Sequence, residues 1–233
     1  SMAADLSPID KAKFVAAKRA VGFVENGMKV GLGTGSTAAW MVRCLGERVR
    51  QEGLKIVGVP TSMRTAELAM SVGIKVISLD EAKWLDLTID GADEFDQNLA
   101  LIKGGGAALT REKIVAAQSK RFICIADESK LVETLGAFPL PVEVIPMATA
   151  RVIKQFAAIG GKAILRMKEG QPLVTDNGQH IVDVMGLQIQ DPLAFESTIS
   201  QWPGVVTVGV FAHQKAQVCL LASASGVKTL TFK

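Results

Sequence analysis

One segment sets the architecture: Lys29-Val-Gly-Leu-Gly-Thr-Gly-Ser-Thr37, in which a short apolar run passes directly into a glycine-rich turn. After the turn, apolar side chains recur at helical spacing as far as Val49. We therefore expect a strand over Lys29–Leu32 and a helix over Thr37–Val49. A strand that runs through a tight turn into a helix is the first half of a βαβ unit, the building block of parallel sheets.

The same alternation of short β-branched runs and longer helical patterns continues over the first 136 residues. It predicts a parallel sheet covered by helices. The predicted helices are Lys11–Glu25, Ser62–Ser71 and a stretch that follows Gly106 and ends near Lys120. The predicted strands are Lys55–Val59, Lys75–Ile77, Leu85–Asp90 and Arg121–Ala126.

The composition shifts at Phe138-Pro-Leu-Pro141, and the order of elements changes beyond it. A strand, a helix, two strands, a helix and a strand are predicted, which is the βαββαβ order of a ferredoxin-like unit. Their ranges are Val142–Ile145, Met147–Ile159, Ala163–Met167, Ile181–Val184, Pro192–Gln201 and Val205–Val210. The last two predicted strands, Gln217–Leu221 and Val227–Phe232, are too short to stand alone, so we expect them to return to the first sheet.

The predicted fold class is therefore α/β, with a Rossmann-like parallel-sheet domain and a second, smaller ferredoxin-like α+β domain. The first domain is expected over residues 1–137 and 213–233, and the second over residues 138–212.

Composition excludes several classes of protein. With 48% apolar and 21% charged residues the chain is not disordered, and its apolar runs stop well short of the roughly 20 residues of a membrane span. A net charge of +3 without a basic stripe argues against a nucleic-acid partner. Cys44, Cys124 and Cys219 are odd in number and widely spaced, which favours free thiols and a cytoplasmic location. We also expect no secretory signal. Only His180 and His213 are available for histidine chemistry.

The glycine-rich turn predicts an anion site, because backbone N–H groups and a helix N-terminus converge there. The hydroxyls of Thr34, Ser36 and Thr37 add donors suited to a phosphate. A dinucleotide fingerprint is disfavoured because the third glycine falls one place early, and a Walker A loop is disfavoured because its lysine is missing. A small phosphorylated ligand is the preferred interpretation, and a tight turn without a ligand stays open.

Acidic and basic residues follow two further predicted turns. Asp90-Gly-Ala-Asp93-Glu94 stands at the end of a predicted parallel strand, where ligands of open α/β sheets gather. Asp90 and Asp93 could ligate Mg²⁺, but no further ligand cluster has suitable spacing. Lys103-Gly-Gly-Gly106 repeats the logic of the first turn, with Lys103 as a natural partner for a phosphate or an oxyanion.

Three other charged residues cannot be assigned by spacing alone. Glu112 either points across the site or pairs with a neighbouring cation on a solvated face. Lys130 follows the end of another parallel strand, and Lys13 lies on the first helix in an unknown direction.

Taken together, these motifs resemble the family of type A ribose-5-phosphate isomerases, and the resemblance covers nearly the whole chain. The matching segments are GLGTGST at 31–37, DGADE at 90–94, KGGGAALTREK at 103–113, FICIADESK at 122–130, FPLPVEVIPMA at 138–148, VTDNG at 174–178 and PGVVTVGVFA at 203–212.

The resemblance implies interconversion of D-ribose 5-phosphate and D-ribulose 5-phosphate in the non-oxidative pentose phosphate pathway, without a metal or organic cofactor. It makes Glu112 the general base that moves a proton between C2 and C1 through a cis-enediolate. It also implies a homodimer or homotetramer, with a pentose phosphate as the partner and neither nucleic acid nor membrane. The substrate-contacting positions it implies are Thr34, Gly35, Ser36, Thr37, Asp90, Gly91, Ala92, Asp93, Lys103, Gly104, Gly105, Gly106 and Lys130.

The reaction explains why these residue types suffice. A carboxylate can remove and return the proton when its pKa is raised toward neutrality. Lys103 and the amides of Gly104–Gly106 can stabilise the enediolate oxygen, although the division of work between Lys103 and Lys130 stays open. Asp90 is the candidate for ring opening and Asp93 for positioning.

The phosphate is assigned mainly to Ser36 and Thr37 with the helix N-terminus, with Lys13 as a further candidate. The alternatives are a non-catalytic sugar-phosphate-binding protein and a nucleotide-dependent enzyme that uses the glycine-rich turn.

Overall fold

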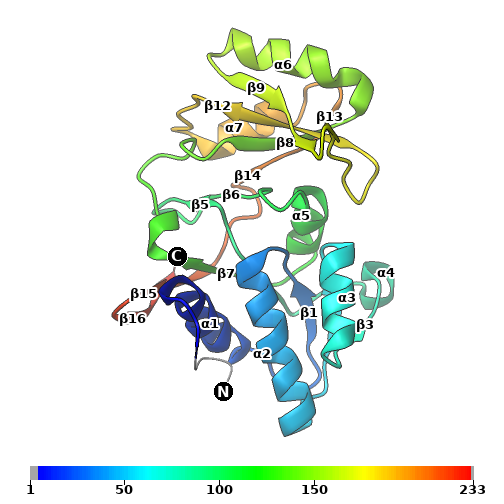
Figure 1. Ribbon diagram of the computed structural model, residues 1–233, viewed down its shortest axis with the longest axis vertical. Coiled ribbons are helices and arrows are strands. Elements are labelled where there is room, and N and C mark those ends of the chain that lie inside the picture. The colour runs from blue at the N-terminus through cyan, green and yellow to red at the C-terminus, as the bar shows by residue number, and fades with distance from the viewer. Residues whose placement is uncertain (1–4, 232–233) are drawn as a thin grey trace. The chain divides into compact units, whose positions relative to one another are not determined.

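A computed structural model describes residues 5–231 (Figure 1). Contacts divide the chain into two compact units. The first unit contains the residues up to Gly91, Arg111–Lys130 and those from Ala216 onward. The second unit contains Ala92–Thr110 and Leu131–Lys215.

The first unit is built on a seven-stranded sheet in the order β16-β15-β7-β4-β1-β2-β3. Neighbouring strands are parallel except at the β15–β16 edge. Counted along the chain, the parallel strands follow the order 3-2-1-4-5-6 of a Rossmann fold. The strands are β1 (Lys29–Leu32), β2 (Val57–Pro60), β3 (Lys75–Val76), β4 (Leu87–Asp90), β7 (Phe122–Asp127), β15 (Val218–Ser223) and β16 (Gly226–Thr231).

Helices cover both faces of this sheet, which is why its inner strands are buried along almost their whole length. Phe14 of α1 and Met41 of α2 share one core with Val30 of β1 and Ile123 of β7. On the other face, Val115 of α5 packs in a smaller core. The helices are α1 (Pro8–Val21), α2 (Ser36–Glu52), α3 (Met63–Ser71), α4 (Leu79–Ala82), α5 (Leu109–Ala117) and the 3₁₀ turn η1 (Glu128–Lys130).

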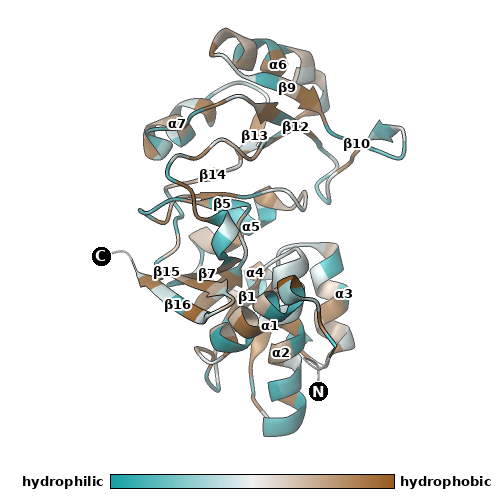
Figure 2. Ribbon diagram, turned by 60° about the vertical axis from the view of Figure 1, so that its left-hand side comes forward, coloured by the Kyte–Doolittle hydropathy of each residue, from teal (hydrophilic) through white to brown (hydrophobic). Residues whose placement is uncertain are grey.

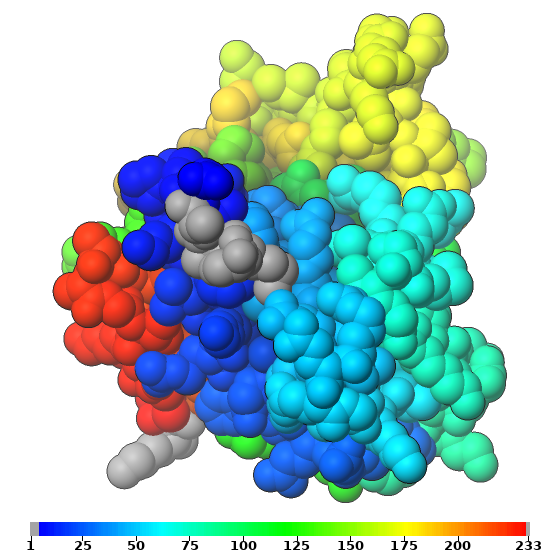
Figure 3. All heavy atoms as spheres, turned by 60° about the horizontal axis from the view of Figure 1, so that its bottom comes forward, coloured from blue at the N-terminus to red at the C-terminus, as the bar shows by residue number. Residues whose placement is uncertain are grey.

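Strands β15 and β16 form one edge of the first sheet, beside α1. In the space-filling view of Figure 3, α1 lies between α2 and the red C-terminal strands β15 and β16, and contacts both. In Figure 2, α2 carries both polar and apolar residues, as a helix that covers a sheet should. The return of the tail to the first sheet is therefore confirmed over the described residues, with Phe232 lying outside them.

The second unit contains a four-stranded antiparallel sheet in the order β13-β8-β12-β9, covered on one face by two helices. The elements are β8 (Leu140–Val144), η2 (Pro146–Ala148), α6 (Thr149–Ala158), β9 (Lys162–Leu165), β12 (His180–Met185), α7 (Pro192–Ile199) and β13 (Val205–Val208). This order confirms the predicted βαββαβ arrangement. A hairpin of β10 (Met167–Lys168) and β11 (Gln171–Pro172) extends from it.

The open face of this sheet packs on the Lys103–Gly106 loop. Leu140, Val142 and Val144 point into the helix-covered core, so Pro141 and Glu143 face the other way. A Cβ on Gly104 would lie 2.8 Å from the Cβ of Pro141, which shows how closely the loop approaches the sheet.

A third sheet was not anticipated from the sequence. It joins β5 (Glu94–Phe95), β6 (Leu101–Ile102) and β14 (Val210–Phe211) in the second unit. The strand predicted over Val205–Val210 is wrong in one respect, because the chain leaves the four-stranded sheet at Gly209. There the Gly209 amide donates to Pro141 O at 2.8 Å, while its carbonyl accepts from Lys103 N at 2.9 Å.

The compact units therefore differ from the predicted domain ranges. Residues 92–110, 131–137 and 213–215 group with the second unit, where β5 and β6 pair with β14. Glu94 reinforces the grouping by accepting hydrogen bonds from Gly136 N and Phe138 N, both at 2.9 Å.

The first helix also differs from its predicted range. It begins at Pro8, because the Ser7 hydroxyl caps it by accepting from Asp10 N, and it ends at Val21 before Gly22.

Within residues 5–231, no helix combines the length and apolar character needed to cross a membrane. Cys44, Cys124 and Cys219 are buried and lie outside any disulfide, as predicted.

Candidate functional site

The carboxyl edge of the first sheet brings two predicted motifs together. Strands β1 and β4 are direct neighbours, and the strand order reverses between them. Ligands of open α/β sheets bind at such a switch point. The glycine-rich turn follows β1 and Asp90 ends β4, so both leave the sheet at this point.

The turn and Asp90 are in close contact. A Cβ on Gly33 would lie 2.2 Å from Asp90 Oδ1, so only glycine fits there without displacing the carboxylate. Asp90 is 2% exposed, and its Oδ1 accepts from Thr34 N at 3.2 Å and from Gly91 N at 2.8 Å. The Asp90 carboxylate is therefore held in one orientation by the backbone of both motifs.

The N-terminus of α2 is built as an anion site. Gly35 precedes the helix with a φ of 111°, a conformation that favours glycine, and makes no side-chain cap for it. Lys13 Nζ donates to Ser36 Oγ at 2.8 Å, so the ammonium of α1 lies beside the first turn of α2. The direction of Lys13, open from sequence, is toward this helix end. An anion bound there would meet both the helix dipole and a cation.

The Thr34 hydroxyl, predicted as a donor to a phosphate, lies among other hydroxyl groups of the protein. Its oxygen lies 2.7 Å from Thr61 Oγ1 and 2.8 Å from Ser62 Oγ. Thr65 completes the cluster by donating to Gly33 O at 2.9 Å. The Thr34 side chain therefore fixes the turn against the start of α3, a role that spacing along the chain did not reveal.

Glu112 lies in the first turn of α5 and is 5% exposed. The alternative of a solvated surface pair is therefore excluded. The helix packs closely on the sheet, since a Cβ on Gly31 would lie 2.6 Å from Val115 Cγ1. Glu112 is thus a buried carboxylate on a helix that rests against β1, the strand leading into the glycine turn.

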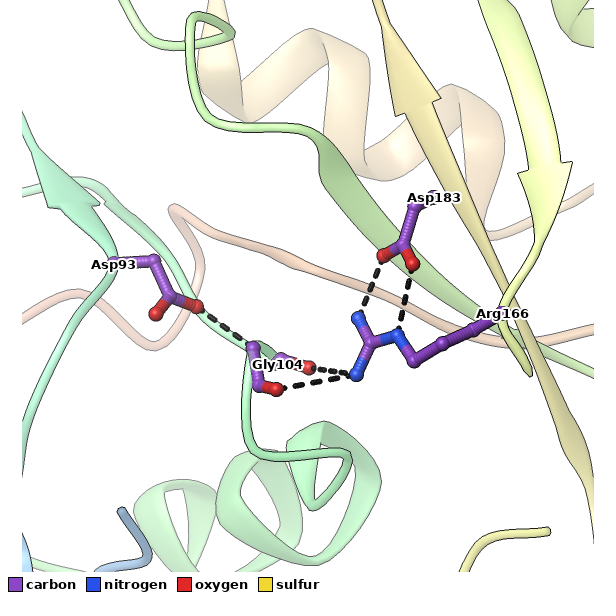
Figure 4. Close-up of polar contacts among 5 residues, drawn as sticks. Asp93, Gly104, Arg166 and Asp183 are labelled. Atoms are coloured by element: carbon purple, nitrogen blue, oxygen red, sulfur yellow. Dashed lines mark hydrogen bonds and ion pairs between the residues drawn. The ribbon is translucent and has the colours of Figure 1, made fainter. Parts of the chain in front are cut away.

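In the second unit, the Lys103–Gly106 loop is held by side chains on two sides (Figure 4). Asp93 Oδ2 accepts from Gly105 N at 2.8 Å. Arg166 Nη1 donates to the carbonyls of Gly104 and Gly105 at 3.1 and 3.2 Å. Arg166 carries no motif signal in the sequence, and its contact with the loop was not predicted.

Lys103 is 3% exposed, an unusual burial for a lysine. Its Nζ lies 5.7 Å from the ring centroid of Phe211, within the range of a cation–π contact. Lys130, at the end of η1, is half-buried.

The predicted site residues divide between the two units. The first unit holds Thr34, Gly35, Ser36, Thr37, Asp90, Gly91, Glu112 and Lys130. The second holds Ala92, Asp93, Lys103, Gly104, Gly105 and Gly106. Among the residues that the structure describes, no group of three or more His, Cys, Asp or Glu side chains is arranged to hold a metal ion.

Comparison with known proteins gives a consistent result. The family model described as ribose 5-phosphate isomerase A (phosphoriboisomerase A) matches residues 57–226. A ribose-5-phosphate isomerase A from Ruegeria sp. (strain TM1040) is 61% identical over 217 residues, which cover 90% of this chain and 83% of the relative.

Solved structures agree over nearly the full length. Ribose 5-phosphate isomerase A from Methanocaldococcus jannaschii is 45% identical, with a TM-score of 0.91 over 95% of this chain and 99% of the other. A D-ribose-5-phosphate isomerase in complex with phospho-erythronic acid is 42% identical, with a TM-score of 0.94 over 97% of this chain and 100% of the other.

Proposed function

The chain belongs to the ribose 5-phosphate isomerase A family, and from this premise we propose that Glu112 is the base with which it interconverts D-ribose 5-phosphate and D-ribulose 5-phosphate. The observation that carries the assignment is the burial of Glu112 in the first turn of α5, within the segment that the family model matches. A carboxylate shielded from water suits proton transfer to and from carbon, because solvent competes less for the proton.

The reaction requires one proton to move between adjacent carbons. After ring opening, Glu112 takes the proton from C2 of the aldose, the C2–H electron pair forms the C1–C2 double bond of a cis-enediolate, and the C1 carbonyl pair moves onto its oxygen. The same carboxyl then returns the proton to C1, while the hydroxyl proton passes from O2 to O1 and the C2 carbonyl forms, which gives the ketose. Asp90 serves ring opening, supported by the two backbone donors that hold its carboxylate at the switch point.

The enediolate oxygens need preorganised donors. We assign this role to the Lys103 ammonium and the amides of the glycine loop. The Gly105 amide donates to Asp93, so it serves the reaction by orienting Asp93 as a positioning residue. Lys130 remains in the proposed substrate-binding set.

The phosphate is assigned to the N-terminus of α2, with Ser36, Thr37 and the ammonium of Lys13. Binding energy gained at this remote group helps to position C1 and C2 for the base. Thr34 and Gly35 shape the turn, and Gly91 and Ala92 continue the backbone from Asp90 toward Asp93.

We further propose that the chain acts in the cytoplasm as a homodimer or homotetramer, in the pentose phosphate pathway. Three buried thiols that form no disulfide support a reducing compartment. Sedimentation equilibrium distinguishes the two assemblies, and a monomeric mass would contradict both.

The decisive experiment measures metal-free conversion of D-ribose 5-phosphate in the presence of EDTA. The wild type should turn over, and Glu112→Gln should lose about 10² to 10⁴ in rate. Glu67→Gln is the matched control, because Glu67 is an exposed helical glutamate of the same unit.

Three results would contradict the proposal. Equal rates in the wild type and Glu112→Gln would remove Glu112 from the role of base and leave Asp90 or Asp93 as candidates. Binding of the sugar phosphate by calorimetry without turnover in the wild type would favour a non-catalytic sugar-phosphate-binding protein. Thermal stabilisation by nucleotides but not by pentose phosphates would favour a nucleotide-dependent enzyme.

A further inference from the structure

Arg166 connects the end of β9 to the glycine loop of the second unit (Figure 4). Asp183 of β12 binds the guanidinium in a bidentate pair, with Nε to Oδ2 at 2.8 Å and Nη2 to Oδ1 at 2.6 Å. The third nitrogen, Nη1, donates to the carbonyls of Gly104 and Gly105. The Arg166 and Asp183 side chains are 16% and 24% exposed, so the pair is largely shielded from solvent.

Within the loop, Ala107 N donates to Gly104 O at 3.0 Å, and side chains of other elements add to this restraint. Gly104, Gly105 and Gly106 are consecutive and have no side chains with which to hold their own conformation. Glycine has the largest backbone freedom of all residues, and Gly104 has a φ of 116°, a conformation that L side chains rarely adopt.

The contacts with Arg166, together with the hydrogen bond from Ala107 N to Gly104 O, restrict where the amides of the loop point. In a trans peptide, the carbonyl of one residue and the N–H of the next lie in one plane and point in opposite directions. The Gly104 carbonyl accepts from Arg166, and the Gly105 N–H of the same peptide accordingly donates to Asp93 on the other side. The Gly105 carbonyl is held in the same way, which directs the Gly106 N–H away from Arg166.

We propose that Arg166, oriented by Asp183, is a positioning residue for the isomerisation. It fixes the directions of the Gly105 and Gly106 amides, and through Gly105 it fixes the carboxylate of Asp93. Hydrogen bonds in series also polarise the peptides that they join, which strengthens the Gly105 amide as a donor to Asp93 and the Gly106 amide as a donor to a developing negative charge. This inference rests on the proposed function of the loop in stabilising the enediolate.

The role requires an arginine. The guanidinium is planar, with donors arranged in a fixed fork, and can bind a carboxylate in a bidentate pair while a further N–H reaches the carbonyls. A lysine ammonium has three donors on a flexible stem and cannot reproduce this arrangement. Arg166→Lys therefore keeps the charge and loses the geometry.

The experiment compares Arg166→Met with Arg151→Met. Arg151 is an exposed residue of α6 in the same unit, so its substitution controls for the loss of one positive charge. Arg166→Met should lower kcat by about 10- to 100-fold, with KM changed by about threefold or less, because misplaced donors affect the transition state more than the bound substrate. Arg166→Lys should fall between the wild type and Arg166→Met.

Phospho-erythronic acid provides a second readout. Its carboxylate presents two coplanar oxygens, as an enediolate does, so its affinity should fall roughly in parallel with kcat in Arg166→Met. Asp183→Asn alone should lower kcat less than Arg166→Met does. Added to Arg166→Met, it should lower kcat by less than about twofold further, because Asp183 acts through Arg166.

The amide proton of Gly105 tests the same idea without activity. In ¹⁵N-glycine-labelled protein, its hydrogen exchange should be faster in Arg166→Met than in the wild type, and unchanged in Arg151→Met.

Two results would overturn the proposal. One is a kcat and an analogue affinity of Arg166→Met within twofold of those of Arg151→Met, and the other is unchanged exchange at Gly105. Absence of turnover in the wild type and in Arg151→Met would refute the proposed function and, with it, this role of Arg166. The hydrogen-exchange rate of the Gly105 amide would still report whether Arg166 holds the loop.

Discussion

Gly33→Ala tests the close packing between the glycine turn and Asp90. Gly33 does not have a positive φ, so alanine is acceptable to the backbone and the cost is steric. The added Cβ would lie 2.2 Å from Asp90 Oδ1, 2.4 Å from Cγ and 2.7 Å from Cα. Rotation of the Asp90 side chain cannot relieve the contact with Cα, so the backbone of β4 or of the turn must move.

The magnitude follows from these contacts. Overpacking of this kind costs about 1–3 kcal/mol in the free energy of unfolding. For a chain of this length, each kcal/mol lowers the melting temperature by about 2–4 °C, so a decrease of roughly 2–12 °C is expected. The same movement breaks the hydrogen bonds from Thr34 N and Gly91 N to Asp90. A shift of about 1 Å in a catalytic group lowers the rate by about 100-fold.

Thermal denaturation followed by circular dichroism and steady-state turnover of D-ribose 5-phosphate measure the two effects. Gly27→Ala is the control, because Gly27 has a φ of 87° and nothing within 4 Å of an added Cβ. It should lose about 1–2 kcal/mol through backbone strain while keeping its kcat. A Gly33→Ala protein with wild-type melting would refute the steric reasoning, and one with lowered melting but full kcat would refute the role of Asp90.

Three further outcomes are expected. Burial, with a contribution from Glu47, raises the pKa of the Cys44 thiol from 9.0 to about 11. Native protein should therefore resist iodoacetamide at about pH 8, and the free energy of unfolding should fall as the pH rises from about 9 to about 11. Rapid labelling of the native protein would contradict this. Glu143→Ala should lower the free energy of unfolding in urea by about 2–4 kcal/mol, and Glu143→Gln by less, because Glu143 is fully buried and Asn177 Nδ2 donates to its Oε2 at 3.1 Å. Equal losses in the two variants would show that this hydrogen bond is unimportant. Lys13→Met should raise KM about tenfold with little change in kcat, because the Lys13 ammonium lies at the proposed phosphate site. An unchanged KM in steady-state assays would assign the phosphate elsewhere.

The parallel sheet could be predicted because its strands are buried on both faces. A run such as Phe122–Ala126 is apolar without alternation, and only a strand covered by helices on both sides tolerates that pattern. The positions of the turns followed directly, since Gly33 and Asp90 stand where such strands end. The switch point between β1 and β4 then brings the glycine turn and Asp90 together. They meet in the hydrogen bond from Thr34 N to Asp90 Oδ1, which joins residues 56 positions apart.

The small sheet could not be predicted, because strands of two residues have no measurable period. Its pairing of Phe211 with Leu101 joins distant segments, and nothing local marks either residue as a strand. The break at Gly209 was missed for a related reason. The valine-rich run around Gly209 predicts one strand. A Cβ at Gly209 would lie 2.6 Å from the carbonyl oxygens of Lys103 and Pro141, so a glycine is required at this position, where the chain changes sheets.

The candidate site shows the same division. The side chains that we propose to meet substrate stand in motifs, so Asp90, Asp93 and Lys103 could be suggested from the sequence. Arg166 binds backbone carbonyls 61 and 62 residues away, and a carbonyl is present at every position, so no pairing of residue types announces the contact. A loop of glycines gains close approach to a ligand by giving up the side chains that would order it. The ordering group must then come from another element, which is why the residue that positions such a loop is found from the fold and not from the loop's own sequence.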